Sequence, residues 1–521
     1  MKKLDFQKLI NNHKKMSKYF LVLMFAVIAI SCSKKVEVKG KVTGGSPLER
    51  MEFIEASGVG TLPLVNIGTD KEGNFSGNFE APKNGMYLIN YAGNQAMVYL
   101  KGGQTFNFSA NGMDFAGTLK VTGDAQKNND YLTAVQKAIG TYAGKIDMGA
   151  LLTKKEPEFL KEAKKIKTDI EKIVDDSAKK ASPDSDVVKF KKDEVLGSIL
   201  GLLSQYEINH PMATQNPSFK TSQAFKDYVK ELEKNNDNMV KNQPIYRNYL
   251  LNKLSADYQT FANANQKNAK DATNSDLFAK FLDTRKDLSQ VTKDYLLAFI
   301  MGQFDIPNVD AKKSEQLSKL VETKITDATV KTDLKKALFA VSGPKKGELA
   351  EENGMVKQDG KAFKFSELKG KPTLVMFYAS WNPYISEAHV PVLKEVVNFY
   401  KAKANFAYIN MDDSKEQFTK TSSALLKGFQ GTNAYAEGGL NSKFAEKWGM
   451  YSFKMPSYII LDKDGKVASQ FFFNLGEQAF VTEMDKLTGL KAPMSSPNPN
   501  AALQNPQVVP QQQQQAPPPA K

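Results

Sequence analysis

The 521-residue chain predicts a multidomain α+β protein with an N-terminal β-sandwich or barrel-like domain, an α-helical middle region and a C-terminal α/β domain. Three observations support this order. Apolar residues alternate with polar ones near residue 36, recur at helical spacing after residue 125, and form alternating strand and helix patterns after residue 344. At roughly 150 residues per domain, the length suits about three cores. We expect a leader at 1–31, the β-rich domain at 32–124, the helical domain at 125–343, the α/β domain at 344–490 and a tail at 491–521.

The leader is followed directly by Cys32, the only cysteine in the chain. It contains an apolar run over residues 21–31, shorter than the roughly 20 residues that a membrane-spanning helix needs. Lysines precede this run at positions 2, 3, 8, 14, 15 and 18. A basic segment, a short apolar segment and small residues before a cleavage point are typical of a secretory signal peptide, and Met1 and Met16 are both suitable starts. An uncleaved anchor is the alternative.

The sequence Ala29-Ile30-Ser31-Cys32 resembles a bacterial lipobox. This resemblance implies that Cys32 is acylated and becomes the mature N-terminus, so that two or three acyl chains hold the protein on a membrane. Ser33-Lys34-Lys35 follows, without an acidic residue. By resemblance to lipoprotein sorting patterns, we expect an outer-membrane lipoprotein facing the periplasm, with cell-surface display as the alternative.

The β-rich domain begins where Val36, Val38 and Val42 alternate with polar residues, the period of a half-buried strand. Further strands are expected at 51–56, 85–91, 95–100 and 105–110. Turn residues separate them at 70–73 and at Gly102-Gly103, the latter with hairpin spacing. A small antiparallel sandwich or barrel is the expected arrangement.

The helical domain is predicted by four apolar stripes. They are Phe159, Ala163, Ile166, Ile170 and Ile173; Val187, Phe190, Val195, Ile199, Leu202 and Leu203; Phe225, Tyr228, Val229 and Leu232; and Tyr295, Leu296, Phe299, Ile300 and Phe304. Such stripes are usually the inward faces of a helical bundle, and partner-binding grooves are the alternative. We expect the prolines at 157, 183, 211, 217, 244 and 307 to lie between helices or at their starts.

The C-terminal part predicts strands at 373–378, 406–411, 457–461 and 467–473, with helices at 386–401, 442–448 and 477–487. Asp462-Lys463-Asp464-Gly465 predicts a hairpin between the last two strands. The tail at 491–521 is rich in proline and glutamine and lacks the apolar residues of a core, so we expect it to be disordered. It is either a plain solvated terminus or a peptide that binds a partner.

The segments 359–372, 373–381 and 455–466 together resemble a thioredoxin-like domain of the TlpA/AhpC-like kind, and residues 65–91 resemble the β-domain that precedes such modules in Bacteroidetes lipoproteins. In that family, a Cys-x-x-Cys motif at a helix start follows the tryptophan equivalent to Trp381, and the helix lowers the pKa of the first thiol. Here the four positions are Asn382-Pro383-Tyr384-Ile385. Met376 stands where thioredoxins often carry a buried carboxylate.

The resemblance also implies a peptide-binding groove. Its candidate residues are Trp381, Asn382, Pro383, Tyr384, Met455 and Pro456, and the family holds the peptide bond before this last proline cis. Tyr384 with His389, and the pair Asp412-Asp413, are alternative acid–base groups. We interpret them instead as a rim aromatic, a helix residue and a strand-end cap.

Other chemistry is excluded or weakly supported. The three histidines lie at positions 13, 210 and 389 without metal-ligand spacing, and no P-loop, G-x-S-x-G or H-E-x-x-H motif is present, so we expect no metal, no cofactor and no catalytic residue. The formal net charge of +14 is spread over mixed-charge helices, which disfavours nucleic-acid binding.

The sequence therefore predicts a non-enzymatic, redox-inactive binding, accessory or scaffold component of a cell-envelope complex, whose partner is an envelope protein or peptide. A thiol–disulfide oxidoreductase, which the family resemblance alone implies, and a passive structural spacer are the alternatives.

Overall fold

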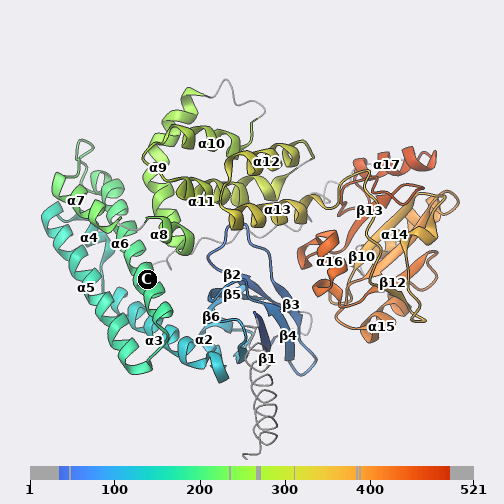
Figure 1. Ribbon diagram of the computed structural model, residues 1–521, viewed down its shortest axis with the longest axis horizontal. Coiled ribbons are helices and arrows are strands. Elements are labelled where there is room, and N and C mark those ends of the chain that lie inside the picture. The colour runs from blue at the N-terminus through green and yellow to red at the C-terminus, as the bar shows by residue number, and fades with distance from the viewer. Residues whose placement is uncertain are drawn as a thin grey trace, which may run out of the picture.

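A computed structural model describes residues 34–45, 49–233, 236–265, 272–309, 311–382, 385 and 389–492. The predicted leader with Cys32, and the predicted tail from residue 493 onward, lie outside the described residues. Figure 1 shows a β-rich part in blue, a helical part from cyan to yellow and a C-terminal α/β part in orange and red. The predicted fold class is thereby confirmed.

The β-rich part consists of two four-stranded sheets in the orders β4-β1-β7-β8 and β3-β2-β5-β6. Its strands are β1 (Lys35–Thr43), β2 (Arg50–Glu55), β3 (Val65–Gly68), β4 (Asn74–Glu80), β5 (Gly85–Tyr91), β6 (Asn94–Leu100), β7 (Thr105–Asn111) and β8 (Lys120–Thr122), with the short helix α2 (Phe115–Thr118) after β7. Val36, Val38 and Val42 are buried in the shared core, as their alternation predicts.

Two details of this region differ from the prediction. Strands β6 and β7, which flank Gly102-Gly103, belong to different sheets, so this turn crosses between the sheets and closes no hairpin. Strand β1 pairs with β7 in parallel, within an otherwise antiparallel arrangement. Both differences have one cause: the spacing of turn residues defines where strands end, whereas the sheet that a strand joins depends on burial of its whole face.

The helical part contains α3 (Gln126–Ala143), α4 (Met148–Thr153), α5 (Glu156–Ala181), α6 (Ser185–Ala213), α7 (Gln223–Leu232), α8 (Asn236–Asn242), α9 (Pro244–Ala264), α10 (Asn274–Thr284), α11 (Gln290–Ile300), α12 (Ala311–Lys324) and α13 (Ala328–Ser342). Members of all four predicted stripes are buried in one continuous core, among them Phe159, Val195, Phe225 and Leu296. Pro211 corrects one expectation because it lies inside α6, two residues before its end, where its missing N–H removes one hydrogen bond from the last turn. No described helix is long and apolar enough to cross a membrane.

The C-terminal part is a five-stranded sheet in the order β13-β10-β11-β12-β9 with helices on both faces. The strands are β9 (Met355–Lys357), β10 (Thr373–Tyr378), β11 (Asn405–Asn410), β12 (Thr432–Ala436) and β13 (Ser457–Leu461), and the helices are α14 (Val390–Tyr400), α15 (Lys415–Leu425), α16 (Lys443–Trp448) and α17 (Gln478–Thr488). Strand β10 is buried on both sides: Val375 and Phe377 pack toward α16, and Leu374 and Met376 toward α14 and α17.

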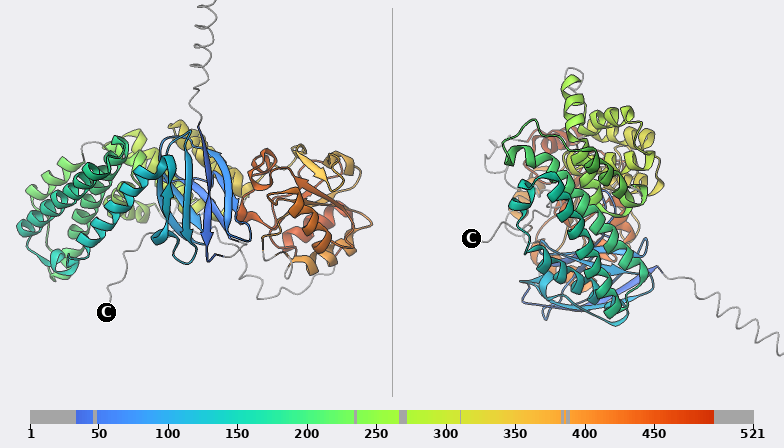
Figure 2. Two further views of the ribbon diagram at one scale, coloured as in Figure 1. Left: turned by 90° about the horizontal axis from the view of Figure 1, so that it is seen from below. Right: turned by 90° about the vertical axis from the view of Figure 1, so that its left-hand side faces the viewer.

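The predicted strand at 467–473 forms only isolated bridges to β13, from Val467 and from Phe472. The Ser469 hydroxyl accepts the Ile460 backbone N–H at 2.9 Å, so a side chain replaces one rung of the ladder. The β-rich part lies between the helical part and the C-terminal part, and the left view of Figure 2 shows this order.

Candidate functional site

The loop after β10 carries the first candidate residue, Trp381, and a buried carboxylate holds this loop in place. The Ser380 backbone N–H donates to Oδ1 of Asp412 at 2.6 Å, and the Asn410 amide donates to Oδ2 at 2.9 Å. Burial raises the pKa of Asp412, and these hydrogen bonds oppose the rise. Asp412 therefore ties the end of β11 to the loop after β10, which confirms the strand-end cap for this residue, whereas Asp413 pairs with Arg50 instead.

Asn382 and Ile385 are the first and last of the four residues that follow Trp381, where the family resemblance predicts the active-site motif. Asn382 is 7% exposed, and its Nδ2 donates to the Met455 carbonyl at 2.5 Å. Ile385 is buried in the apolar cluster between the sheet and α14. Neither side chain can form a thiolate or a disulfide. Pro383 and Tyr384, also predicted for this site, lie outside the described residues.

The loop before β13 closes the other side of the site. The peptide bond between Met455 and Pro456 is cis, as the family resemblance implies. Both residues are buried, and the Met455 carbonyl is taken by Asn382. The described members of the predicted groove thus lie together, with the backbone acceptor of the loop already paired within the domain.

Lys454, which sequence reasoning missed, is 1% exposed beside this loop. Among the described residues its Nζ has no hydrogen-bond partner, and it lies 4.1 Å from the centroid of the Phe471 ring. Burial lowers the pKa of Lys454 to about 7. Burial therefore disfavours the charged form of Lys454, and the contact with the Phe471 ring takes the place of hydrogen bonds to that charge.

Of the other acid–base candidates, Tyr384 and His389, only His389 lies within the part of the chain that the structure describes. Nδ1 of His389 lies 3.2 Å from the Tyr458 hydroxyl on β13, and burial lowers the pKa of the histidine. Met376 is fully enclosed in the same apolar cluster as Tyr458. The central strand therefore presents a thioether to this cluster.

Trp381 is covered by the β-rich part of the chain. The Arg50 guanidinium, at the start of β2, lies 4.5 Å from the centroid of the Trp381 ring and pairs with Asp413 at 2.6 Å. Sequence reasoning missed this contact. The only pointer to it is composition: the chain has 68 lysines and three arginines, at 50, 247 and 285.

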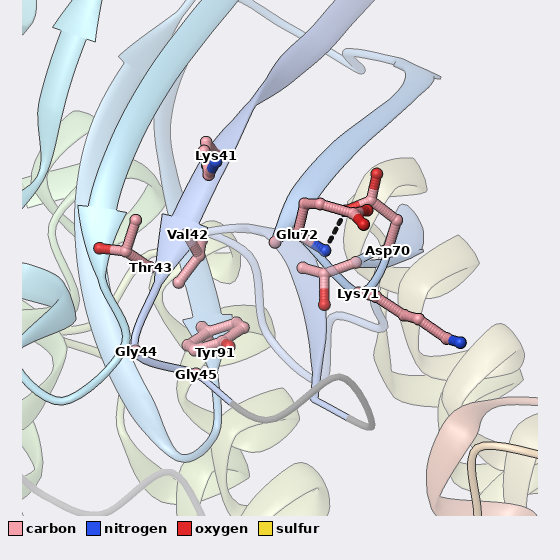
Figure 3. A pocket seen from close by; sticks show the side chains of 11 residues that line it. Lys41, Val42, Thr43, Gly44, Gly45, Asp70, Lys71, Glu72 and Tyr91 are labelled. Carbon is pink, nitrogen blue, oxygen red and sulfur yellow. Dashed lines mark hydrogen bonds between the residues drawn. The ribbon is translucent and has the colours of Figure 1, made fainter.

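A separate hollow of about 300 Å³ lies in the β-rich part, at the end of β1 and beside the β3–β4 turn (Figure 3). Lys41, Asp70 and Tyr91 are among the residues that line it. The Asp70 carboxylate accepts the backbone N–H groups of Glu72 and Asn74 at 3.0 and 2.8 Å, so it is used to form the turn. Within the described ranges, no group of three or more His, Cys, Asp or Glu side chains is arranged to hold a metal ion.

Comparison with known proteins finds relatives of the C-terminal part. Residues 333–480 match the family described as Redoxin. A comparison with curated proteins found no match. Among solved structures, the C-terminal domain of a protein assigned as a thiol-disulfide oxidoreductase from Bacteroides thetaiotaomicron is 25% identical, with 28% of this chain and 97% of that chain covered and a TM-score of 0.25.

Two further solved structures are similar over the same part of the chain. A thiol-disulfide oxidoreductase from Bacteroides fragilis is 19% identical, covering 27% of this chain and 99% of its own, with a TM-score of 0.24. A protein assigned as the thiol:disulfide interchange protein DsbE from Chlorobium tepidum is 22% identical, covering 28% and 99%, also with a TM-score of 0.24. The family match and the sheet of β9–β13 together identify the region near residues 333–480 as a redoxin/thioredoxin-like domain.

Proposed function

We propose that this protein is a cell-envelope lipoprotein whose thioredoxin-like domain binds without transferring electrons. Acylation at Cys32 anchors it to the outer membrane, facing the periplasm, and it acts as an accessory or scaffold component of an envelope complex. The lipobox-like sequence before Cys32 supports the anchor. Its partner is an envelope protein or peptide, which binds the folded part of the chain.

One observation carries the redox part of this proposal. Asn382, at the position of the family's attacking thiol, uses its amide to bond the Met455 carbonyl at 2.5 Å. Thiol–disulfide exchange needs a thiolate that attacks a disulfide sulfur, and a second thiol that resolves the mixed disulfide. The chain has one cysteine, and acylation would occupy it.

A thiol–disulfide oxidoreductase is the second candidate because the family match and the names of the similar structures favour it. Such an activity in this chain would require a thiol supplied by another protein. A passive spacer is the third candidate, and the covered position of Trp381 favours it.

Reduction of insulin by the full chain, with dithiothreitol as electron donor, tests the redox part. We expect the chain and its Cys32→Ser variant to match the buffer rate, while a variant carrying Asn382→Cys and Ile385→Cys supplies the two missing thiols for comparison. Turnover of the unaltered chain above buffer would contradict the proposal. Fractionation of cells tests the anchor: the unaltered chain should sediment with membranes and Cys32→Ser should lose this attachment, whereas equal sedimentation would exclude a lipid on Cys32.

A further inference from the structure

The β-rich part contacts the thioredoxin-like domain through a sheet edge. Strand β3 is the last strand of its sheet, so within the described part of the chain one side of its backbone has no strand partner. The side chain of Asn441 pairs with this free side: its Oδ1 accepts the Asn66 backbone N–H at 3.0 Å, and its Nδ2 donates to the Asn66 carbonyl at 2.8 Å. An amide side chain thus recognises both backbone groups of one extended residue.

Arg50 supplies the charged part of this contact. Its Nη1 and Nη2 donate to the two carboxylate oxygens of Asp413 at 2.9 and 2.6 Å, and its Nε donates to the Asn66 side chain. The flat guanidinium also lies over the Trp381 ring at 4.5 Å. A lysine ammonium cannot make a paired bond to a carboxylate and stack on an indole at once.

Two neighbours complete the fit. The Ser452 hydroxyl, three residues before Met455, donates to the Glu52 carboxylate on β2. Gly68 gives Asp413 room, because a Cβ at this position would lie 2.7 Å from Nη1 of Arg50 and 2.8 Å from Oδ2 of Asp413. The contact therefore reaches both walls of the predicted groove, the Trp381 loop and the loop that leads to Pro456.

We infer that Trp381, Asp413, Asn441 and Ser452, here named the Trp381 face, form a binding site for a β-sheet edge, and that strands β2 and β3 of the same chain are its ligand: β2 supplies Arg50 and Glu52, and β3 supplies the free backbone of Asn66. This inference deepens the proposed function and rests on it, because it names what the redox-inactive domain binds. Each recognition element has its counterpart: aromatic ring and carboxylate for the guanidinium, and amide for the backbone.

The consequence is that the Trp381 face is filled while the two parts are docked. Arg50 and Asp413 have side-chain exposures of 8% and 35%, so the ion pair is only partly shielded from solvent. Salt weakens such a pair, whereas a fully buried one is screened much less. A partner peptide reaches the Trp381 face only after β2 and β3 leave it, which makes the docking a competition between the chain's own strand and a ligand of the same chemistry.

Hydrogen exchange of the full-length protein tests this inference at the Asn66 amide. Asp413→Asn keeps the size of the side chain and removes its charge, and Asn441→Ala removes the amide that pairs with β3. We expect either change to accelerate exchange in the peptide containing β3 by about ten-fold, because docking protects this amide. Arg285→Ala is the matched control, since Arg285 also combines carboxylate pairing, to Asp257 and Asp287, with an aromatic ring, and does so entirely within the helical part.

Acrylamide quenching of tryptophan fluorescence supplies a second readout. Trp448 is fully buried, so a gain in quenching belongs to Trp381. Arg50→Ala should raise the quenching constant about two-fold and also accelerate exchange in β3. Greater quenching without faster exchange would show that Arg50 merely shields the ring, and would overturn the inference, as would unchanged exchange in folded Asp413→Asn. Insulin reduction is scored separately, so activity there would contradict the proposed function and leave the docking result readable.

Discussion

The two junctions of the β-rich part use arginine in opposite ways. At the junction with the helical part, Arg247 of α9 is 2% exposed, and its Nη1 donates to the carbonyls of Ser57 and Val240, each at 2.9 Å. At the junction with the thioredoxin-like domain, Arg50 is paired with a carboxylate and stacked on Trp381 at a partly solvated edge. Arg247 thus donates hydrogen bonds to backbone carbonyls inside a core, whereas Arg50 forms an ion pair with the Asp413 carboxylate near solvent.

The two contacts differ in how far solvent reaches them. The Arg247 contact is fixed inside the core, whereas the Asp413 side chain of the second contact is 35% exposed, so water and salt can compete with Arg50 for it, as the docking inferred above requires. Two of the chain's three arginines stand at these junctions, among 68 lysines elsewhere. The planar fork of arginine is thus used where fixed geometry joins one part of the chain to another.

Arg247→Met should break the first junction and give the largest effect. It leaves the Ser57 and Val240 carbonyls unpaired, so we expect a loss of about 3 kcal/mol in the free energy of unfolding. Chemical denaturation measures this loss, with Arg285→Met as the control on the more exposed side of the helical part. A loss no larger than that of the control would show that Arg247 is not the fixed contact described above.

Lys454→Met tests what the hydrogen bonds of Arg247 contribute. Lys454 is equally buried, but among the described residues its Nζ has no hydrogen-bond partner. Its folded pKa of about 7 lies below the ordinary 10.5, so below pH 7 the folded protein carries the full cost of a buried charge. Between pH 7 and 10.5 the unfolded chain holds a proton that the folded chain has lost, and the stability of the native lysine protein rises.

We therefore expect Lys454→Met to stabilise the protein by about 2 kcal/mol at pH 7, with the gain shrinking toward pH 10. Urea unfolding at both pH values measures it, and the exposed Lys463→Met should change little. A destabilised variant would mean that the Phe471 contact, and not burial, dominates at this site.

Asp333→Asn gives the smallest effect and adds a pH dependence to the helical junction. Burial, and then the nearby Glu55, raise the pKa of Asp333 on α13 to about 6, while Lys336 and Lys83 oppose this rise and Asp327 adds to it. Between pH 3.8 and 6 the folded chain holds a proton that the unfolded chain has released, so stability falls as pH rises through this window.

Asp333→Asn has no group that titrates at this position, so it removes that loss of stability. We expect a gain of about 1 kcal/mol at pH 7.5, discounted for partial solvent screening, and no gain at pH 3.5. Thermal unfolding across this range measures the difference, with the exposed Asp464→Asn as the control. A gain that is equal at both pH values would assign the effect to packing.

Local patterns predicted the elements and a resemblance predicted the site. The run 373–378 forms a strand because it is apolar throughout and is buried on both faces. The helical stripes are largely buried where their spacing predicts, but Phe304 of the fourth stripe is 54% exposed because the chain leaves the α-helical period at Met301–Asp305. Met455 and Pro456 meet Asn382 because the loop before β13 and the end of β10 are neighbours in this fold.

The contact over Trp381 was beyond such reasoning. Arg50 and Asp413 are 363 positions apart, and nothing in either neighbourhood encodes the other. Their pairing follows from the placement of a sheet edge against a loop, which depends on all three parts of the chain. For the same reason the sequence predicts a strand-end cap from both Asp412 and Asp413, whereas only Asp412 makes the hydrogen bonds of that cap.

The position of β3 also bears on solubility. An unpaired sheet edge is a template on which a second molecule can add a strand, and such edges seed aggregation unless something covers them. In this protein Asn441 covers the edge at Asn66, with a side chain that satisfies the backbone but cannot extend the sheet. The thioredoxin-like domain thereby shields the exposed sheet edge of the neighbouring β-rich part, a role that needs the fold of the domain and no thiol.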